Sequence, residues 1–270
     1  MIVKVAVLQY HLGEKIARED KLFLIRRRPD FVCLPEYYFI RPDCTGMEEA
    51  AQAMEDNVAV LQRLSVDLET TVIGGSMVLK NGKGYANTSL IFSRGRLAGS
   101  YQKVNLYGKE SRRGLVPGKE ITAFTIDGAR VGVLICADVL NPQSFKSLKK
   151  QRADMVFVPT TSPYRPDDTL FEKQLRDNTI FVRGAQLANA YVIKTCGVGT
   201  LFGNRLQGRS GIFAPWGILA RTAVEDENRQ RILLALLDLE EIREFKEKMV
   251  FSAGVPAGEN NGSSVPSPSD

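Results

Sequence analysis

The stretch Val131-Gly-Val-Leu-Ile-Cys136 ends in a thiol and is followed by Ala137, Asp138 and then Asn141-Pro142. Its length and β-branched content indicate a buried strand, and the polar residues after it indicate a turn. A side chain at the carboxyl end of a central strand lies where α/β proteins place their chemistry. Cys136 is therefore a candidate nucleophile. Because the only histidine is His11, we expect the base that activates this thiol to be a carboxylate or a lysine.

The same stretch belongs to an internal repeat. Arg130-Val-Gly-Val-Leu-Ile135 resembles Lys4-Val-Ala-Val-Leu-Gln9, and Asp154-Met-Val-Phe-Val-Pro159 resembles Asp30-Phe-Val-Cys-Leu-Pro35. Residues 191–196 match 71–76 in pattern, and residues 212–220 match 91–98 if one residue slips. The order is the same and the offset stays between 120 and 126 residues. Four matches in register predict two related βα units.

Each half is predicted to run strand, helix, strand, helix, strand, strand. The first half has expected helices at residues 17–28 and 47–70; the second has them at 144–151 and 170–189, with Phe171, Leu175 and Phe181 facing inward. Helices on one face of each sheet leave the other face apolar. Packing the two sheets together buries those faces, so we expect an α/β fold with a four-layer α–β–β–α sandwich.

The sandwich is predicted to be a single domain over residues 1–250. Residues 238–250 form its last expected helix, which is charged and suited to packing on the body or on a second subunit. The chain then becomes polar and rich in Ser, Pro and Gly, so residues 251–270 are predicted to be a flexible C-terminal tail.

Composition narrows the function classes. Of 270 residues, 44% are hydrophobic and 25% charged, as in an ordinary soluble globular protein. The net charge of +5 comes from dispersed basic residues, which argues against nucleic-acid binding. No apolar run is long enough to span a membrane, and the N-terminus lacks the features of a signal peptide. These features, with four scattered cysteines, favour a cytoplasmic location and free thiols.

Neither a metal nor a cofactor is expected. One histidine and four cysteines without metal-type spacing cannot build a usual zinc site. The glycine-rich stretches lack the spacing of a phosphate loop or of a dinucleotide fingerprint. Of the other thiols, Cys33 and Cys196 are expected in the core, and Cys44 in a polar loop near Glu36 without a role in the chemistry. His11 opens the loop after the first strand, where a surface or capping role is the simpler interpretation.

Three further charged residues stand near the ends of predicted strands. Glu36 follows Phe31-Val-Cys-Leu-Pro35, while Lys103 and Glu110 lie in Ser100-Tyr-Gln-Lys-Val-Asn-Leu-Tyr-Gly-Lys-Glu110. Alone, each would be read as a surface or capping charge. Together with Cys136 they follow strands or enter the loops beyond them, and strand ends of one sheet edge meet in space.

This arrangement resembles the nitrilase superfamily of carbon–nitrogen hydrolases, in its amidase-like branch. The resemblance rests on Leu34-Pro35-Glu36, on Tyr101-Gln102-Lys103 with Pro117-Gly118, and on Leu134-Ile135-Cys136-Ala137-Asp138. Residues 183–192 and 208–211 are similar to later blocks of the family, so the resemblance covers roughly residues 2–240.

The resemblance implies a mechanism. Glu36 would be the general base, Cys136 the nucleophile that forms a thioester, and Lys103 the oxyanion stabiliser, while Glu110 would position substrate or assist proton transfer. The backbone N–H of Ala137 is suited to share the oxyanion. The substrate is expected to be a small-molecule amide, and the protein to be a homodimer or larger homo-oligomer. Aromatic side chains after strand ends are candidates to line the substrate pocket: Tyr37, Tyr38, Tyr107 and Tyr164.

Other functions stay open. After Cys136 the chain reads Ala137-Asp138 rather than the Trp-Glu of true nitrilases, which favours an amide over a nitrile. The same site would serve an acyltransferase in which an amine accepts the acyl group. A non-catalytic scaffold or binding protein would be expected to have lost a member of the triad, and a redox role for Cys136 has no adjacent partner cysteine.

Overall fold

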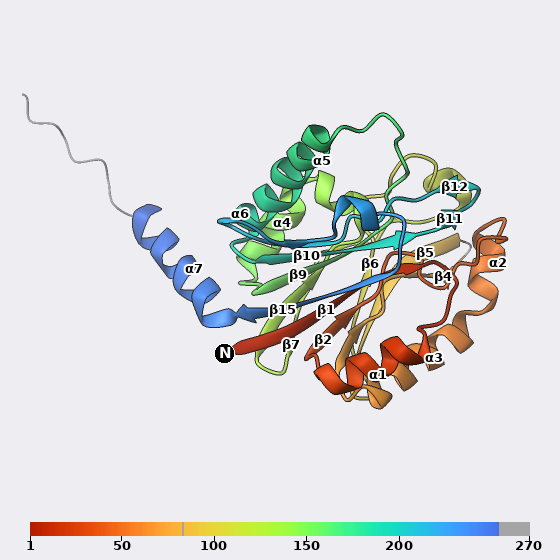
Figure 1. The fold of residues 1–270 in the computed structure, drawn as a ribbon, viewed down its shortest axis with the longest axis horizontal. Coiled ribbons are helices and arrows are strands. Elements are labelled where there is room, and N and C mark those ends of the chain that lie inside the picture. Colours follow the sequence, from red (N-terminus) through yellow and green to blue (C-terminus); the bar gives the residue numbers. More distant parts are fainter. Residues whose placement is uncertain (83, 254–270) are drawn as a thin grey trace, which may run out of the picture.

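Two sheet layers pack face to face between two layers of helices (Figure 1). The computed structural model describes residues 1–82 and 84–253, so the predicted tail lies, apart from its first three residues, outside the described residues. The domain boundary at residue 250 stays a prediction. No helix in the described ranges is long and apolar enough to cross a membrane.

The first half supplies one sheet, apart from its edge strand β15, and the helices that cover it. The strands run β15-β1-β2-β3-β5, with β4 and β6 paired to β5, and the helices are α1 to α3. Their bounds are β1 (Ile2–His11), α1 (Arg18–Arg27), β2 (Phe31–Cys33), α2 (Met47–Gln52), α3 (Met54–Asp67), β3 (Thr71–Ile73), β4 (Met77–Asn81), β5 (Gly84–Ser93), β6 (Arg96–Gln102) and β15 (Arg231–Asp238).

The second half supplies the other sheet, apart from its edge strand β7, in the order β7-β8-β9-β10-β13-β14. The elements are β7 (Ala123–Ile126), β8 (Ala129–Val133), α4 (Pro142–Lys150), β9 (Met155–Thr160), α5 (Leu170–Arg176), α6 (Arg183–Ala188), β10 (Tyr191–Val198), β13 (Gly211–Ala214) and β14 (Gly217–Arg221), with a small hairpin of β11 (Thr200–Leu201) and β12 (Asn204–Arg205). The sheets meet where the ends of β1 and β10 pair in parallel, Tyr10 opposite Gly197.

Hydrogen bonds confirm that the two halves are related. The Asp30 carboxylate accepts from the Lys4 N–H at 2.7 Å, and the Asp154 carboxylate accepts from the Arg130 N–H at 2.9 Å. The backbone N–H of each aspartate returns a bond to the carbonyl of the same partner. Each of the two hairpins β5–β6 and β13–β14 also carries a register shift, after Ile91 and after Ile212. The repeat predicted from sequence is thus a repeat of backbone geometry.

The two halves also exchange their last strands. β7 follows the first-half hairpin but pairs antiparallel with β8, the first strand of the second half. β15 follows the second-half hairpin but pairs antiparallel with β1, the first strand of the first half. Each sheet therefore contains a strand from the other half of the chain, which makes the predicted single domain hard to divide.

Three apolar clusters hold the layers together. The central one lies between the sheets, where the rings of Phe31 on β2 and Phe157 on β9 are 5.7 Å apart. A second packs Leu61 of α3 on the first sheet, and a third packs Phe145 of α4 on the second. Burial of this apolar area is the main force that stacks the layers.

Two predicted helices differ in detail. Residues 47–70 form α2 and α3, with a break at Ala53. Residues 170–189 form α5, a π-helical turn η3 (Asp177–Val182) and α6.

The predicted inward face of α5 was wrong. Phe181 is buried, but Phe171 and Leu175 are 70% and 48% exposed. The inward positions are taken by Lys173 and Asp177, which find buried partners of opposite charge in Glu227 and Arg209. Apolar periodicity alone could not anticipate that a charged pair would occupy the buried face.

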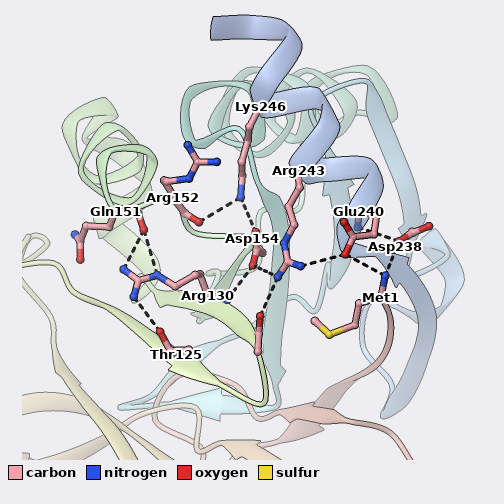
Figure 2. A network of polar contacts seen from close by, with 11 residues as sticks. Met1, Thr125, Arg130, Gln151, Arg152, Asp154, Asp238, Glu240, Arg243 and Lys246 are labelled. Carbon is pink, nitrogen blue, oxygen red and sulfur yellow. Dashed lines mark hydrogen bonds and ion pairs between the residues drawn. The ribbon is translucent and has the colours of Figure 1, made fainter.

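The last helix, α7 (Leu239–Ala253), extends from the body in Figure 1 and is held at its base by charges. Figure 2 shows Asp154 accepting from Lys246 at 2.6 Å and from Arg243 at 3.1 Å. Nearby, the N-terminal ammonium of Met1 forms ion pairs with Asp238 and Glu240. The aspartate that precedes β9 in the repeat thus also anchors α7 to the start of that strand.

Candidate active site

The four charged or nucleophilic residues singled out in the sequence lie together. Glu36 follows β2, Lys103 follows β6, and Cys136 comes shortly after β8. All three line one cavity of about 480 Å³, together with Glu110. Strand ends from both sheets therefore converge on a single pocket.

Cys136 lies in a sharp turn. Its φ is +45°, in the left-handed region that a residue with a Cβ seldom adopts, and it begins the 3₁₀ turn η2 (Cys136–Leu140). Its Sγ lies 3.5 Å from the carbonyl oxygen of Thr161, which accepts the thiol hydrogen bond. Backbone strain of this kind persists only when its surroundings hold it.

Asp138 holds the turn. One carboxylate oxygen accepts from the Tyr101 hydroxyl at 2.7 Å and the Ile135 N–H at 2.8 Å. The other accepts from the N–H and side-chain amide of Asn105 at 2.7 and 2.9 Å. A fully buried carboxylate thus ties the Cys136 turn to the segment that carries Lys103.

Asp138→Ala should destabilise the protein by about 3 kcal/mol, because buried donors on Tyr101, Ile135 and Asn105 would lose their acceptor. In a chain of this size that corresponds to a fall in Tm of roughly 6–12 °C. Thermal unfolding followed by circular dichroism measures it. Asp138→Asn is the matched control: it keeps one acceptor oxygen and should lose less. An unchanged Tm in the alanine variant would contradict the account.

Glu36 is 1% exposed and accepts four hydrogen bonds. One oxygen accepts from Lys103 Nζ at 2.9 Å and from Asn87 Nδ2 at 3.0 Å. The other accepts from the N–H of Thr161 at 3.0 Å and from its hydroxyl. Thr161 therefore contacts both Glu36 and Cys136. Its segment and that of Asn87 were not recognised from the sequence.

Lys103 joins the two carboxylates. Its Nζ lies 2.9 Å from an oxygen of Glu36 and 2.9 Å from an oxygen of Glu110. Glu110 also accepts from the Tyr37 hydroxyl at 2.9 Å and from the Tyr107 N–H at 2.7 Å. The described residues accept from two of its three N–H groups, which leaves Lys103 one donor for a ligand.

Two glycines permit the close contacts around these loops. A Cβ at Gly75, which has φ of +61°, would lie 1.9 Å from the Pro35 carbonyl oxygen beside Glu36. A Cβ at Gly118 would lie 2.3 Å from the Gln102 carbonyl oxygen, and the Gly118 N–H donates to the Lys103 carbonyl. Gly118, from the Pro117-Gly118 pair noted in the sequence, therefore lets the backbone pack closely against the loop that carries Lys103.

Charge and burial set the protonation states. Burial and the negative charge of Glu36 raise the pKa of the Cys136 thiol, although Lys103 opposes them. Burial would lower the pKa of Lys103, but the charges of Glu36 and Glu110 outweigh it and raise that pKa. The resting site therefore contains a neutral thiol beside an ammonium group.

Of the predicted substrate-binding residues, some line the cavity and one does not. Tyr37, Tyr107 and Ala137 line the cavity. Tyr164, expected in the pocket, is not among the lining residues; it is partly exposed, with Arg205 4.3 Å above its ring. Its strand β9 ends at Thr160, and the intervening residues lead Tyr164 away to the β12 hairpin, where its N–H bonds to the Arg205 carbonyl.

Other residues weighed from the sequence lie away from the cavity lining. These are His11, Tyr38, Cys33, Cys44 and Cys196. Within residues 1–82 and 84–253, no group of three or more His, Cys, Asp or Glu side chains is arranged to hold a metal ion.

A family model described as carbon-nitrogen hydrolase matches residues 14–247. The chain belongs to that family. This confirms the resemblance to the nitrilase superfamily drawn from the sequence. Among curated proteins, it is 23% identical over 261 residues to a deaminated glutathione amidase of Synechocystis sp., covering 88% of this chain and 91% of that protein.

Solved structures of similar proteins have the same fold. A carbon-nitrogen hydrolase from Helicobacter pylori G27 aligns with a TM-score of 0.78 at 19% identity, over 97% of this chain and 98% of that one. A mutant amidase from Nesterenkonia sp. AN1, with an acetamide moiety added covalently at its active site cysteine, aligns with a TM-score of 0.68 at 18% identity, over 94% and 97%. These likenesses support the four-layer architecture.

Proposed function

We propose that the protein hydrolyses the amide bond of a small substrate through a thioester on Cys136. The observation that carries the proposal is the buried Glu36–Lys103 pair in the same cavity as the strained cysteine. The family and the amidase names of its relatives support the reaction class.

In the acylation step, Glu36 takes the thiol proton while Sγ attacks the amide carbon. A neutral thiol with a raised pKa requires such a base, since little thiolate is present beforehand. The carbonyl oxygen becomes an oxyanion, which Lys103 Nζ and the backbone N–H of Ala137 stabilise. The C–N bond then breaks, the amine leaves with the proton that Glu36 held, and the thioester remains.

In the deacylation step, Glu36 acts as the base again. It takes a proton from a water molecule whose oxygen attacks the thioester carbon. Collapse of the second oxyanion breaks the C–S bond, the proton returns to Sγ, and the carboxylic acid leaves. One carboxylate thus serves both halves of the reaction, and no step requires a metal or cofactor.

Glu110 is proposed to be a positioning residue. Its oxygens already accept from Lys103, Tyr37 and Tyr107. These contacts hold the lysine donor toward the cavity and fix the loop that carries Tyr107. The sequence left substrate positioning and proton transfer open for this residue; these contacts favour a third role, the positioning of Lys103 and of the Tyr107 loop.

Activity should survive exhaustive chelation and be lost on treatment with iodoacetamide. The mechanism relies on a thiol that lines the cavity, whereas Cys33, Cys44 and Cys196 are buried elsewhere. Ammonia release from a panel of small amides, with and without EDTA, measures the first effect. Peptide mass spectrometry should place the alkyl group on Cys136. Loss of activity with chelator and its return with metal would overturn the cysteine-hydrolase proposal.

A further inference from the structure

A buried cluster of charges lies at one wall of the active-site cavity. Its two carboxylates are Asp177, the first residue of the π-helical turn η3, and Glu227. Asp177 pairs with Arg209 at 2.7 Å, Arg221 at 3.1 Å and Lys194 at 3.9 Å. Glu227 pairs with Lys173 at 2.6 Å and with Arg209 at 3.5 Å.

The cluster contains more positive than negative charge. Four cations share two carboxylates, and only the side chain of Arg221 has appreciable exposure. Setting Arg221 aside as solvated, three buried cations face two buried anions. An unbalanced buried charge is costly, so a site of this kind is completed by a monoanion that enters from the cavity.

Lys194 is the side chain that most lacks a partner. It interrupts the apolar strand β10, is 3% exposed and lines the cavity. Its Nζ lies 4.4 Å from the centroid of the Phe181 ring and 3.9 Å from Asp177, and the described residues offer it no hydrogen bond. An ammonium group that makes no hydrogen bond, with the Asp177 carboxylate oxygen 3.9 Å away, is expected to bind an acceptor supplied by a ligand.

Arg209 adds a second incomplete donor at the same wall. It lines the cavity and is 5% exposed. Its Nη2 donates to Asp177 and to the Lys173 carbonyl, while its buried Nε lies 3.5 Å from a Glu227 oxygen and forms no hydrogen bond among the described residues. Asp177 and Glu227 therefore hold the guanidinium in place without using all of its donors.

The mouth of the cavity is also positively charged. Lys109, Arg113 and Arg165 line the cavity and are exposed. The acids in the lining are already paired: Glu36 and Glu110 with Lys103, and Asp168 with Arg176. A cationic rim of this kind raises the local concentration of anions and their rate of entry.

We propose that Lys194 and Arg209 bind a carboxylate of the substrate, so that the preferred substrates are amides carrying a carboxylate apart from the scissile amide group. The turnover test of this carboxylate site rests on the proposed amide hydrolysis. The single surplus charge at the wall matches a monoanion, and the π-helical turn places Asp177 where it can orient both cations.

Hydrolysis of succinamate and glutaramate should be compared with that of their neutral methyl esters, with ammonia as the readout. The wild-type enzyme should favour the carboxylates by about 10- to 100-fold in kcat/KM, the range expected of hydrogen bonds to a charged group. Lys194→Met should reduce this ratio to near unity, mainly through KM. Arg221→Met is the matched control: it removes another cation paired with Asp177 that does not line the cavity, and should keep the preference.

A second measurement does not depend on turnover. Calorimetric titration of Cys136→Ala protein with glutaramate should detect binding that is weakened about tenfold or more by adding Lys194→Met. Circular dichroism would check that each variant folds, with Lys194→Gln as a second replacement. A wild-type enzyme indifferent to the carboxylate, or equal binding with and without Lys194, would overturn the inference. If no amide is hydrolysed but the titration behaves as expected, the amidase proposal fails and the carboxylate site stands.

Discussion

Cys136→Ala is expected to abolish turnover, leaving a rate at least about 10⁴-fold below that of the wild type, as loss of a covalent nucleophile usually does. The replacement removes only Sγ. Alanine also has a Cβ, so the strain at φ +45° is the same in both proteins and the fold should be kept. Ammonia release from the best substrate of the amide panel gives the rate, and circular dichroism checks the fold.

Cys44→Ala is the matched control, because Cys44 is buried outside the cavity lining; this variant should keep its turnover. Wild-type protein quenched during turnover should show an acyl adduct on Cys136 by mass spectrometry. Full activity in the Cys136 variant, or an adduct on another residue, would refute the thioester.

The fold was predictable because short sequence patterns specify its strands and because these patterns occur twice in the chain. Asp30 and Asp154 precede matching apolar strands, and their identical hydrogen bonds show that the sequence match encodes geometry. The pairing of β15 with β1 joins residues more than a hundred positions apart, such as Val3 and Leu237, which no local pattern records, whereas β7 forms a local hairpin with β8. The face of α5 was misjudged for a related reason: Lys173 is buried by a distant partner, Glu227.

The site was predictable where chemistry follows a strand in the sequence. Glu36, Lys103 and Cys136 each do so, and they line one cavity. Thr161 was missed because threonine is ordinary in a loop; the available signal was the repeat, in which Pro159-Thr160-Thr161 is the equivalent of Pro35-Glu36-Tyr37. Lys194 had a clearer signal in the sequence, because it is a charged residue inside an apolar strand. Its role could be inferred only from the residues that surround it in the structure.

Glu36→Gln should have two opposite effects on the cysteine. Loss of the base should slow turnover by about 10²- to 10⁴-fold, the usual contribution of a positioned general base. The pKa of Cys136 should nevertheless fall, because burial and the charge of Glu36 raise it and Lys103 lowers it. Removing the carboxylate leaves the lysine less opposed. A group whose pKa falls ionises at lower pH, so more thiolate should be present at any pH below the wild-type pKa.

Thiolate absorbance near 240 nm, titrated against pH with the corresponding Cys136→Ala protein subtracted, measures this shift, and ammonia release measures turnover. A low rate with an easily formed thiolate would separate two functions of Glu36: it would show that the enzyme needs a proton acceptor at the moment of attack and does not rely on a stored thiolate. If Glu36 instead served only to position Lys103, the variant should retain a rate within about tenfold of the wild type. A rate within about tenfold of the wild type, or an unchanged pKa of the Cys136 thiol, would show that Glu36 is not the base.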